Sequence, residues 1–293
     1  MDSTDNPYLL LTPGPLSTSP GVRSAMLRDW CTWDDDYNLG IVTPLRKKLE
    51  SLASASPGFT SVLMQGSGTF CVESMIGTFL PSSGRLLVAT NGAYGDRIAQ
   101  IAERLGISLQ KLDFGEVGRV EPAAVVRALD FDPTITHVAV VHGETTTGML
   151  NPVREIGREV RARGRVMMVD AMSTFGGVPL DMKEWDIDVL VSSANKCLQG
   201  VPGFGFILAR RELLEACKGR ARSLALDAYD QWTAMENGKG KWRYTSPTHT
   251  VRALAQAVQE LDEEGGVEAR HRRYCENHAI LVDGYTALGL EPL

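Results

Sequence analysis

The chain has 293 residues, of which 43% are hydrophobic and 23% charged, a composition typical of one large globular domain or of a large domain with part of a second. Its formal net charge of −6 argues against a protein that binds nucleic acid or an anionic membrane. No apolar run approaches the ~20 residues of a membrane-spanning helix, and the N-terminus lacks the basic flank of a signal peptide. The five cysteines are scattered and form no C-x-x-C pair, which predicts a reduced, cytoplasmic protein.

Near the N-terminus, the stretch "WDDDYN" places three acidic residues side by side at positions 34–36. It lacks the glycine and the glutamate of an EF-hand loop. A solvated turn is the favoured interpretation, and a metal site is the alternative. Elsewhere no spacing of histidine, cysteine and carboxylate residues predicts a zinc site.

Six short apolar runs have the character of buried strands in a parallel sheet. Helical patterns follow the first three runs, and in the last of these Val153, Ile156 and Val160 recur at helical spacing. The alternation of strands and helices predicts an α/β fold with a mainly parallel central sheet flanked by helices. The predicted strands span residues 61–64, 85–90, 137–141, 165–170, 188–193 and 205–209, and the helices 69–79, 94–106 and 151–164.

Ligands of such sheets bind beyond the carboxyl ends of the strands, so the residues that follow each strand are candidates for a site. These segments read "QGSGT", "NGAYG", "HGETTTG", "DAMSTFGG" and "SANK". Each is rich in glycine or small polar residues. We expect the five loops to converge on one edge of the sheet.

The first loop, "QGSGTF", joins a strand to a helix and could bind an anion. Gly66, Ser67, Gly68 and Thr69 would offer backbone N–H groups and two hydroxyls at the helix N-terminus, which suits a phosphate. The loop is neither a Walker motif nor a dinucleotide fingerprint, since Cys71 stands where the third glycine would be. A plain glycine turn with a Ser/Thr helix cap remains the alternative.

The next two loops carry single polar side chains whose roles the pattern leaves open. Tyr94 could stack on a flat ring or could simply pack in the core. Thr145 could hydrogen-bond a ligand or belong to a polar turn. For His142 a satisfied structural role is favoured over a ligand role.

Asp170 and Lys196 each follow a buried run, where a charged group needs a partner. Asp170 either caps the next helix or pairs with a cation in the site. Lys196 either lies on the surface after its strand ends or puts its amine to chemical use. Its neighbour Cys197 has no paired histidine and is interpreted as a bystander.

A lysine amine, a phosphate-binding loop, a strand-end carboxylate and an aromatic side chain are together the parts that hold pyridoxal phosphate. The amine forms a Schiff base with the aldehyde, so a buried lysine need carry no charge. The carboxylate keeps the pyridine nitrogen protonated, which makes the ring an electron sink. The loop, the aromatic residue, the hydroxyl, the aspartate and the lysine follow in that order along the chain.

With these residues in hand, the chain resembles the class V aminotransferases, a family of fold-type I pyridoxal-phosphate enzymes. "TPGP" and the aspartate–lysine pair suit the wider family, which includes the alanine– and serine–glyoxylate transaminases. "CTWDDDYN" and "WRYTSPTHT" resemble the branch that uses 2-aminoethylphosphonate. The resemblance covers nearly the whole chain.

The resemblance implies a role for each matching position. Lys196 would be the Schiff-base lysine and proton shuttle, and Asp170 would pair with the pyridine nitrogen. Tyr94 would stack on the cofactor ring and Thr145 would bond its phenolic oxygen. The remaining cofactor and substrate contacts would come from Ser67, Gly68, Thr69 and Asn195 at the phosphate, Thr245 at the phosphate of a partner subunit, and the backbone of Gly14 near the substrate.

The same resemblance implies the reaction and the organisation of the chain. The amino group of 2-aminoethylphosphonate would pass to pyruvate with ping-pong kinetics, in a homodimer with shared active sites. An N-terminal segment would span residues 1–20, a large cofactor-binding domain 21–262, and the start of a small α/β C-terminal domain 263–293. The family continues beyond that point and takes from there an arginine for the substrate's anionic group.

Two alternatives compete with this interpretation. A glyoxylate transaminase is the nearest enzymatic alternative. A fragment that binds the cofactor but is inactive is the alternative from another class, because the C-terminal part of the family pattern is missing. A cysteine desulfurase is disfavoured, since no cysteine of this chain lies where that relative's catalytic loop would be.

Overall fold

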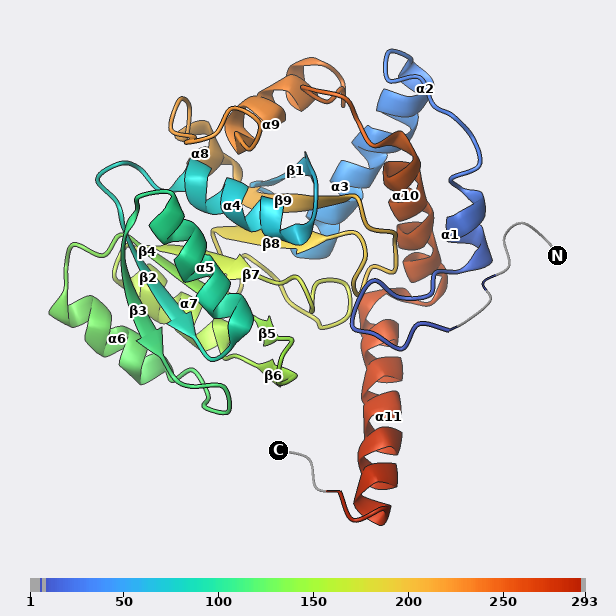
Figure 1. Ribbon diagram of the computed structural model, residues 1–293. Coiled ribbons are helices and arrows are strands. Elements are labelled where there is room, and N and C mark those ends of the chain that lie inside the picture. Colours follow the sequence, from blue (N-terminus) through green and yellow to red (C-terminus); the bar gives the residue numbers. More distant parts are fainter. Residues whose placement is uncertain (1–5, 7–8, 291–293) are drawn as a thin grey trace.

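A seven-stranded sheet forms the centre of the structure, a computed structural model that describes residues 6 and 9–290 (Figure 1). The strand order is β1-β9-β8-β7-β4-β2-β3. A short hairpin, β5–β6, lies beside the sheet. The strands are β1 (Phe59–Gln65), β2 (Arg85–Thr90), β3 (Ser108–Asp113), β4 (His137–Val141), β5 (Gly143–Glu144), β6 (Met149–Leu150), β7 (Val166–Asp170), β8 (Val189–Ser193) and β9 (Phe204–Arg210).

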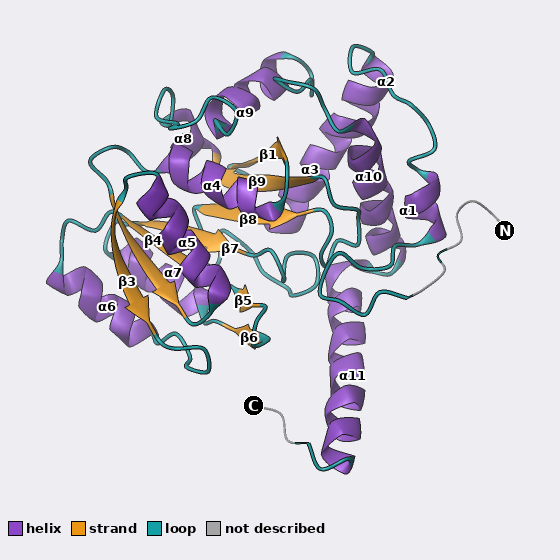
Figure 2. Ribbon diagram, in the orientation of Figure 1, coloured by secondary structure: helices purple, strands orange, loops and turns teal. Residues whose placement is uncertain are grey.

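Helices cover both faces of this sheet (Figure 2). They are α1 (Pro20–Ser24), α2 (Asp35–Tyr37), the π-helical turn η1 (Asn38–Val42), α3 (Thr43–Ala53), α4 (Gly68–Phe79), α5 (Ala93–Arg104), α6 (Pro122–Phe131), α7 (Val153–Ala162), α8 (Arg211–Glu215), α9 (Ala228–Asn237), α10 (Thr248–Glu263) and α11 (Gly266–Ala287). Two apolar cores result, because alternate side chains of each strand point to opposite faces. In β4, for example, Val138 and Val140 belong to one core and Ala139 and Val141 to the other.

The predicted α/β fold with a mainly parallel sheet is confirmed. Strands β8, β7, β4, β2 and β3 run parallel to their neighbours in that series. The three predicted helices correspond to α4, α5 and α7, and Val153, Ile156 and Val160 are buried as their spacing predicts. Because parallel strands share a direction, the loops after β2, β4, β7 and β8 emerge at one edge of the sheet.

The run at 205–209 was expected to be a parallel strand, and this expectation is wrong. It forms β9, which is antiparallel to both of its neighbours, β1 and β8. The connection between β8 and β9 consists of residues 194–203 and contains no helix. A parallel pairing requires a long crossover, whereas so short a connection returns the chain alongside β8 in the opposite direction.

Helix α11 extends away from the sheet (Figure 1). At its base, Arg270 is buried, pairs with Glu264 at 2.8 Å and donates a hydrogen bond to the carbonyl oxygen of Cys197 at 2.7 Å. These contacts join α11 to the turn that carries Lys196. Of the predicted segments 1–20 and 263–293, residues 1–5, 7–8 and 291–293 lie outside the described part of the chain, and the division into domains stays a prediction.

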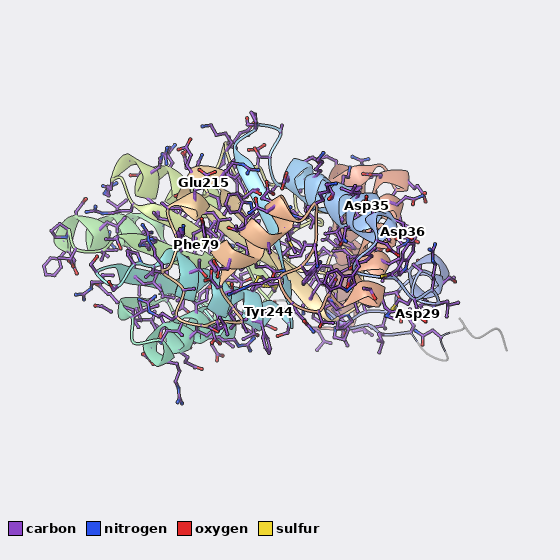
Figure 3. All side chains as sticks on the ribbon, turned by 90° about the horizontal axis from the view of Figure 1, so that it is seen from above. Asp29, Asp35, Asp36, Phe79, Glu215 and Tyr244 are labelled. Atoms are coloured by element: carbon purple, nitrogen blue, oxygen red, sulfur yellow. The ribbon has the colours of Figure 1, made fainter. Side chains whose placement is uncertain are left out.

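The acidic stretch near the N-terminus lies on the surface, at the end of the molecule that carries α1 and α2. Asp34, Asp35 and Asp36 are exposed, and Figure 3 shows the last two at the same end as Asp29. In residues 6 and 9–290, no group of three or more histidine, cysteine or carboxylate side chains is placed to hold a metal ion. Over the same residues, no helix has both the length and the apolar character that crossing a membrane requires.

Candidate active site

Lys196 lies in the turn after β8, and its side chain is half-buried. Its Nζ donates a hydrogen bond to the carbonyl oxygen of Gly14 at 3.1 Å. Burial lowers the pKa of the amine, and the positive charge of Arg97 lowers it further against the opposing influence of Cys197 and Asp170. Lys196 is therefore not a solvated surface lysine, and its amine is more readily neutral than a solvated one.

Asp170 ends β7 and is 3% exposed. Its Oδ1 accepts a hydrogen bond from the backbone N–H of Met172 at 2.9 Å. Burial raises the pKa of the carboxyl to about 6, and the nearby Glu144 contributes to this rise, while the N–H of Met172 and the charges of Arg97 and Lys196 oppose it. The alternative of a helix cap is wrong, because a series of turns follows Asp170 and the next helix is α8.

The loop "QGSGTF" places the N-terminus of α4 beside Asp170. Ser67 occupies the N-cap position, but its hydroxyl makes no capping hydrogen bond. A Cβ atom on Gly68 would lie 2.5 Å from Sδ of Met172, so a larger residue at this position would require the Met172 side chain to move. The first turn of α4 thus presents N–H groups and a hydroxyl next to a buried carboxylate.

Tyr94, in the first turn of α5, lines a cavity together with Gly68, Thr69 and Asp170. The backbone N–H of Tyr94 donates to the buried carboxylate of Glu144 at 3.2 Å, which fixes the start of α5 against the hairpin. The free space in this cavity is about 20 Å³. A ligand larger than water therefore needs flexible side chains on the cavity wall to move.

Thr145 lies next to this cavity rather than in its lining. Its hydroxyl is hydrogen-bonded to that of Ser173, and both residues line a second cavity of about 480 Å³ that extends to His271 and Tyr274 of α11. Asn195 is half-buried beside Lys196. The segments after four strands, β1, β2, β4 and β7, thus contribute to these two cavities, whereas no residue of the loop after β8 lines either of them.

Thr245 lines neither of these cavities. It is exposed, in the connection between α9 and α10, and it does not line the cavity beside Asp170. Its predicted role needs a second subunit.

The sequence interpretation missed three residues of the site: Arg97, Glu144 and Met172. Arg97 lies three positions after Tyr94, so the helical period places both on one face of α5, which was a usable signal. Glu144 lies within "HGETTTG", directly before Thr145. Met172 gave no signal, since an apolar side chain after a strand is ordinarily part of the core.

Two other residues that the sequence analysis considered, His142 and Cys197, are held by packing and hydrogen bonds within the protein. His142 is buried, its Nδ1 is 2.9 Å from Oγ1 of Thr174, and its ring packs edge-on against Trp185. Burial lowers the pKa of His142 to about 4, so the ring is neutral at pH 7. Cys197 donates a hydrogen bond to the carbonyl oxygen of Ser173, and burial raises the pKa of its thiol to about 11. A neutral thiol is a poor nucleophile, which fits its interpretation as a bystander.

Comparison with known proteins identifies the family. Residues 45–289 match the family model for class-V aminotransferases. The chain is 63% identical to the 2-aminoethylphosphonate–pyruvate transaminase of Syntrophobacter fumaroxidans, over 99% of this chain and 78% of that relative. It is 59% identical to the transaminase of the same name from Vibrio vulnificus, over 98% of this chain and 78% of that relative.

A solved structure agrees with these sequence matches. The crystal structure of pyridoxamine–pyruvate aminotransferase from Mesorhizobium loti superposes with a TM-score of 0.89 at 25% identity, covering 99% of this chain and 74% of that one. The sheet, the helices on both of its faces and the loops at its edge therefore have a known counterpart. On this evidence, the chain belongs to the class-V aminotransferase family.

Proposed function

We propose that the chain transfers the amino group of 2-aminoethylphosphonate to pyruvate, giving phosphonoacetaldehyde and L-alanine, with pyridoxal phosphate as cofactor. The observation that carries this proposal is the 63% and 59% identity, over nearly the whole chain, to two transaminases named for these substrates. The cytoplasm is the compartment we propose, since all five cysteines are free thiols.

The donor set of the site fits this cofactor. An aldehyde needs an amine that is readily neutral, and Lys196 has a lowered pKa. A ring nitrogen that is to stay protonated needs a carboxylate, and Asp170 is buried without a capping role. A phosphate needs N–H and hydroxyl donors at a helix N-terminus, where Ser67, Gly68 and Thr69 lie.

When bound, pyridoxal phosphate supplies an electron-withdrawing ring that stabilises negative charge on the carbon next to the substrate's nitrogen. Lys196 accepts the proton of that carbon at Nζ and later returns it, which requires the amine to be neutral. The carbonyl oxygen of Gly14 accepts a hydrogen bond from Nζ and so orients it. Asp170 keeps its negative charge above about pH 6 and holds the ring nitrogen's proton in place.

The remaining roles are proposed from the family resemblance. Tyr94 stacks on the cofactor ring, Thr145 bonds its phenolic oxygen, and Asn195 helps to bind the phosphate. Thr245 reaches the phosphate in a neighbouring subunit, which makes the active enzyme a homodimer. The exposure of Thr245 leaves it accessible to such a partner.

The visible absorption spectrum tests the proposed function. The purified chain with pyridoxal phosphate should show the yellow band of a lysine-bound cofactor. Addition of 2-aminoethylphosphonate without pyruvate should convert this band to that of the pyridoxamine form, and pyruvate should restore it. A band that ignores this amine but responds to alanine or serine would favour a glyoxylate transaminase. A band that responds to no amine would favour an inactive fragment.

Replacing Gly14 with alanine is expected to lower kcat/KM about tenfold and the melting temperature by a few degrees, because the backbone there is unfavourable for a residue with a side chain. Gly14 has φ +147°, and a Cβ atom there would lie 2.5 Å from Cδ of Lys196 and 2.7 Å from the carbonyl oxygen of Asn195. The segment must then move away from the lysine. Gly115→Ala is the matched control, because Gly115 also has a positive φ but has nothing within 4 Å of its Cβ position. Equal losses in both variants would contradict the proposed role of Gly14.

A further inference from the structure

Arg97 lies among the residues of the proposed cofactor site, but the proposed function gives it no role. Its Cζ is 4.7 Å from the centre of the Tyr94 ring. Its Nη1 donates to Oγ1 of Thr69 at 3.5 Å. It lines the same cavity as Gly68 and Asp170. The guanidinium therefore adjoins the phosphate loop, the aromatic residue and the strand-end carboxylate at once.

The charge of Arg97 is poorly balanced by its surroundings. The side chain is half-buried, and within residues 6 and 9–290 no carboxylate oxygen lies within 4.0 Å of its nitrogens. Its hydrogen bond to Thr69 is at the long limit for such a contact. Asp170 lines the same cavity but forms no ion pair with the guanidinium at short range, so an anion bound directly to this half-buried cation would be favoured.

A phosphate is the anion that best suits this position. The first turn of α4 offers N–H groups and hydroxyls but no positive side chain of its own. The guanidinium lies beside Thr69 in that turn, and its planar fork of N–H donors matches the oxygens of a phosphate. The face of Tyr94 holds the guanidinium by a cation–π contact and limits where it can point.

We propose that Arg97 is a cofactor-binding residue, whose guanidinium binds the phosphate group of pyridoxal phosphate beside Thr69. This inference rests on the proposed function, since it presupposes that cofactor. It adds a positively charged side chain to the phosphate site, to which the sequence analysis assigned only Ser67, Gly68, Thr69 and Asn195.

The electrostatics of the neighbouring groups agree with a cation in this place. Asp170 faces Glu144, Cys71, Lys196 and Arg97, and of these the two cations lower the pKa of its carboxyl. The charge of Arg97 also lowers the pKa of Lys196. One guanidinium thus favours the ionised carboxylate and the neutral amine, the two states that the proposed reaction uses.

Cofactor binding to the full chain tests the inference without measuring turnover. Pyridoxal phosphate and pyridoxal, which lacks the phosphate, are each titrated into cofactor-free protein and followed by the visible band. Arg97→Met is expected to weaken pyridoxal phosphate binding about 10- to 100-fold, the value of one or two charge-assisted hydrogen bonds. Pyridoxal binding should change less than about threefold. Arg97→Lys should recover part of the loss, because it keeps the charge but not the fork.

Two controls accompany these titrations. Arg104→Met removes the same charge from the exposed last turn of the same helix and should leave both affinities unchanged. Inorganic phosphate should compete with pyridoxal phosphate for the unaltered protein and compete more weakly for Arg97→Met.

Three results would overturn the inference. Equal weakening of pyridoxal phosphate and pyridoxal would mean that Arg97 acts on the ring. Tighter binding by Arg97→Met would mean that the guanidinium fills space that the cofactor needs. Unchanged affinity would mean that Arg97 takes no part in binding. Each of these results requires that the unaltered chain shows the yellow band, whereas failure of the unaltered chain to show it would overturn the proposed function itself.

Discussion

Replacing Lys196 with alanine is expected to abolish amino-group transfer, lowering kcat/KM by about 10,000-fold. The substitution removes the amine that holds the cofactor's aldehyde and the base that moves the proton. Neither function has a substitute nearby, because the other cation of the site, Arg97, cannot lose its proton at neutral pH. The measurement is the rate at which L-alanine forms from 2-aminoethylphosphonate and pyruvate, because the variant cannot show the yellow band of a lysine-bound cofactor.

Two further variants separate this effect from general damage. Lys183→Ala removes an exposed lysine from the turns between β7 and β8 and should leave the rate unchanged. Lys196→Arg keeps a positive charge but provides no neutral amine, so it should be as inactive as Lys196→Ala. Substantial activity in either Lys196 variant would show that another group carries the proton. A small added amine that restores part of the rate to Lys196→Ala would support the role of Lys196 as the base.

Replacing Asp170 with asparagine is expected to lower kcat/KM about 100- to 1,000-fold, the usual cost of losing one buried electrostatic contact to the reacting system. Asparagine can still accept the hydrogen bond from the N–H of Met172, so the local backbone is preserved. It carries no charge with which to keep a ring nitrogen protonated. Steady-state kinetics with 2-aminoethylphosphonate and pyruvate measure the loss.

The same substitution is expected to stabilise the cofactor-free fold at pH 7.5. The pKa of Asp170 is about 6 in the folded chain, against the ordinary value of 3.8, so the folded state holds its proton more tightly than the unfolded state does. Stability therefore falls as the pH rises from about 4 to about 6, and the loss persists above that range. Asparagine removes this penalty, which amounts to at most about 3 kcal/mol. At pH 4 the two proteins should be nearly equally stable.

Melting temperatures of both proteins between pH 4 and pH 7.5 measure this difference. Asp188→Asn is the matched control, because Asp188 is also buried but pairs with Arg210 at 2.6 Å. Breaking that pair should lower the melting temperature rather than raise it. A melting temperature of Asp170→Asn that follows the unaltered protein at every pH would contradict the raised pKa of Asp170.

Much of the site could be predicted because one rule links sequence to space in a parallel sheet. Gly68, Thr69, Tyr94 and Asp170 lie at or shortly after the ends of three separate strands, yet they line one cavity. Each segment follows a buried strand. Strand β2, which precedes Tyr94, and strand β7, which ends at Asp170, run in the same direction. The local patterns were therefore enough to bring these residues together.

The parts that could not be predicted depend on contacts between distant segments. Nothing near Gly14 in the sequence indicates that its carbonyl oxygen lies 3.1 Å from Nζ of Lys196. Strand β3 was missed because it lies at the edge of the sheet, where its partly exposed side chains give no continuous apolar run. The reversed direction of β9 was missed because an apolar run has the same composition in either orientation.

The position of β9 also has a consequence for how the chain is made. Strand β1 lies at the edge of the sheet and pairs only with β9, and even the nearest paired residues, Gln65 and Phe204, are separated by about 140 residues. At ribosomal speeds of about 5 to 20 residues per second, β1 leaves the ribosome roughly 7 to 28 seconds before its partner strand does. Throughout that interval its apolar residues and unpaired backbone can pair with other nascent chains. Of the paired strands in this sheet, β1 waits longest for its partner, so it is the strand that most needs protection during synthesis.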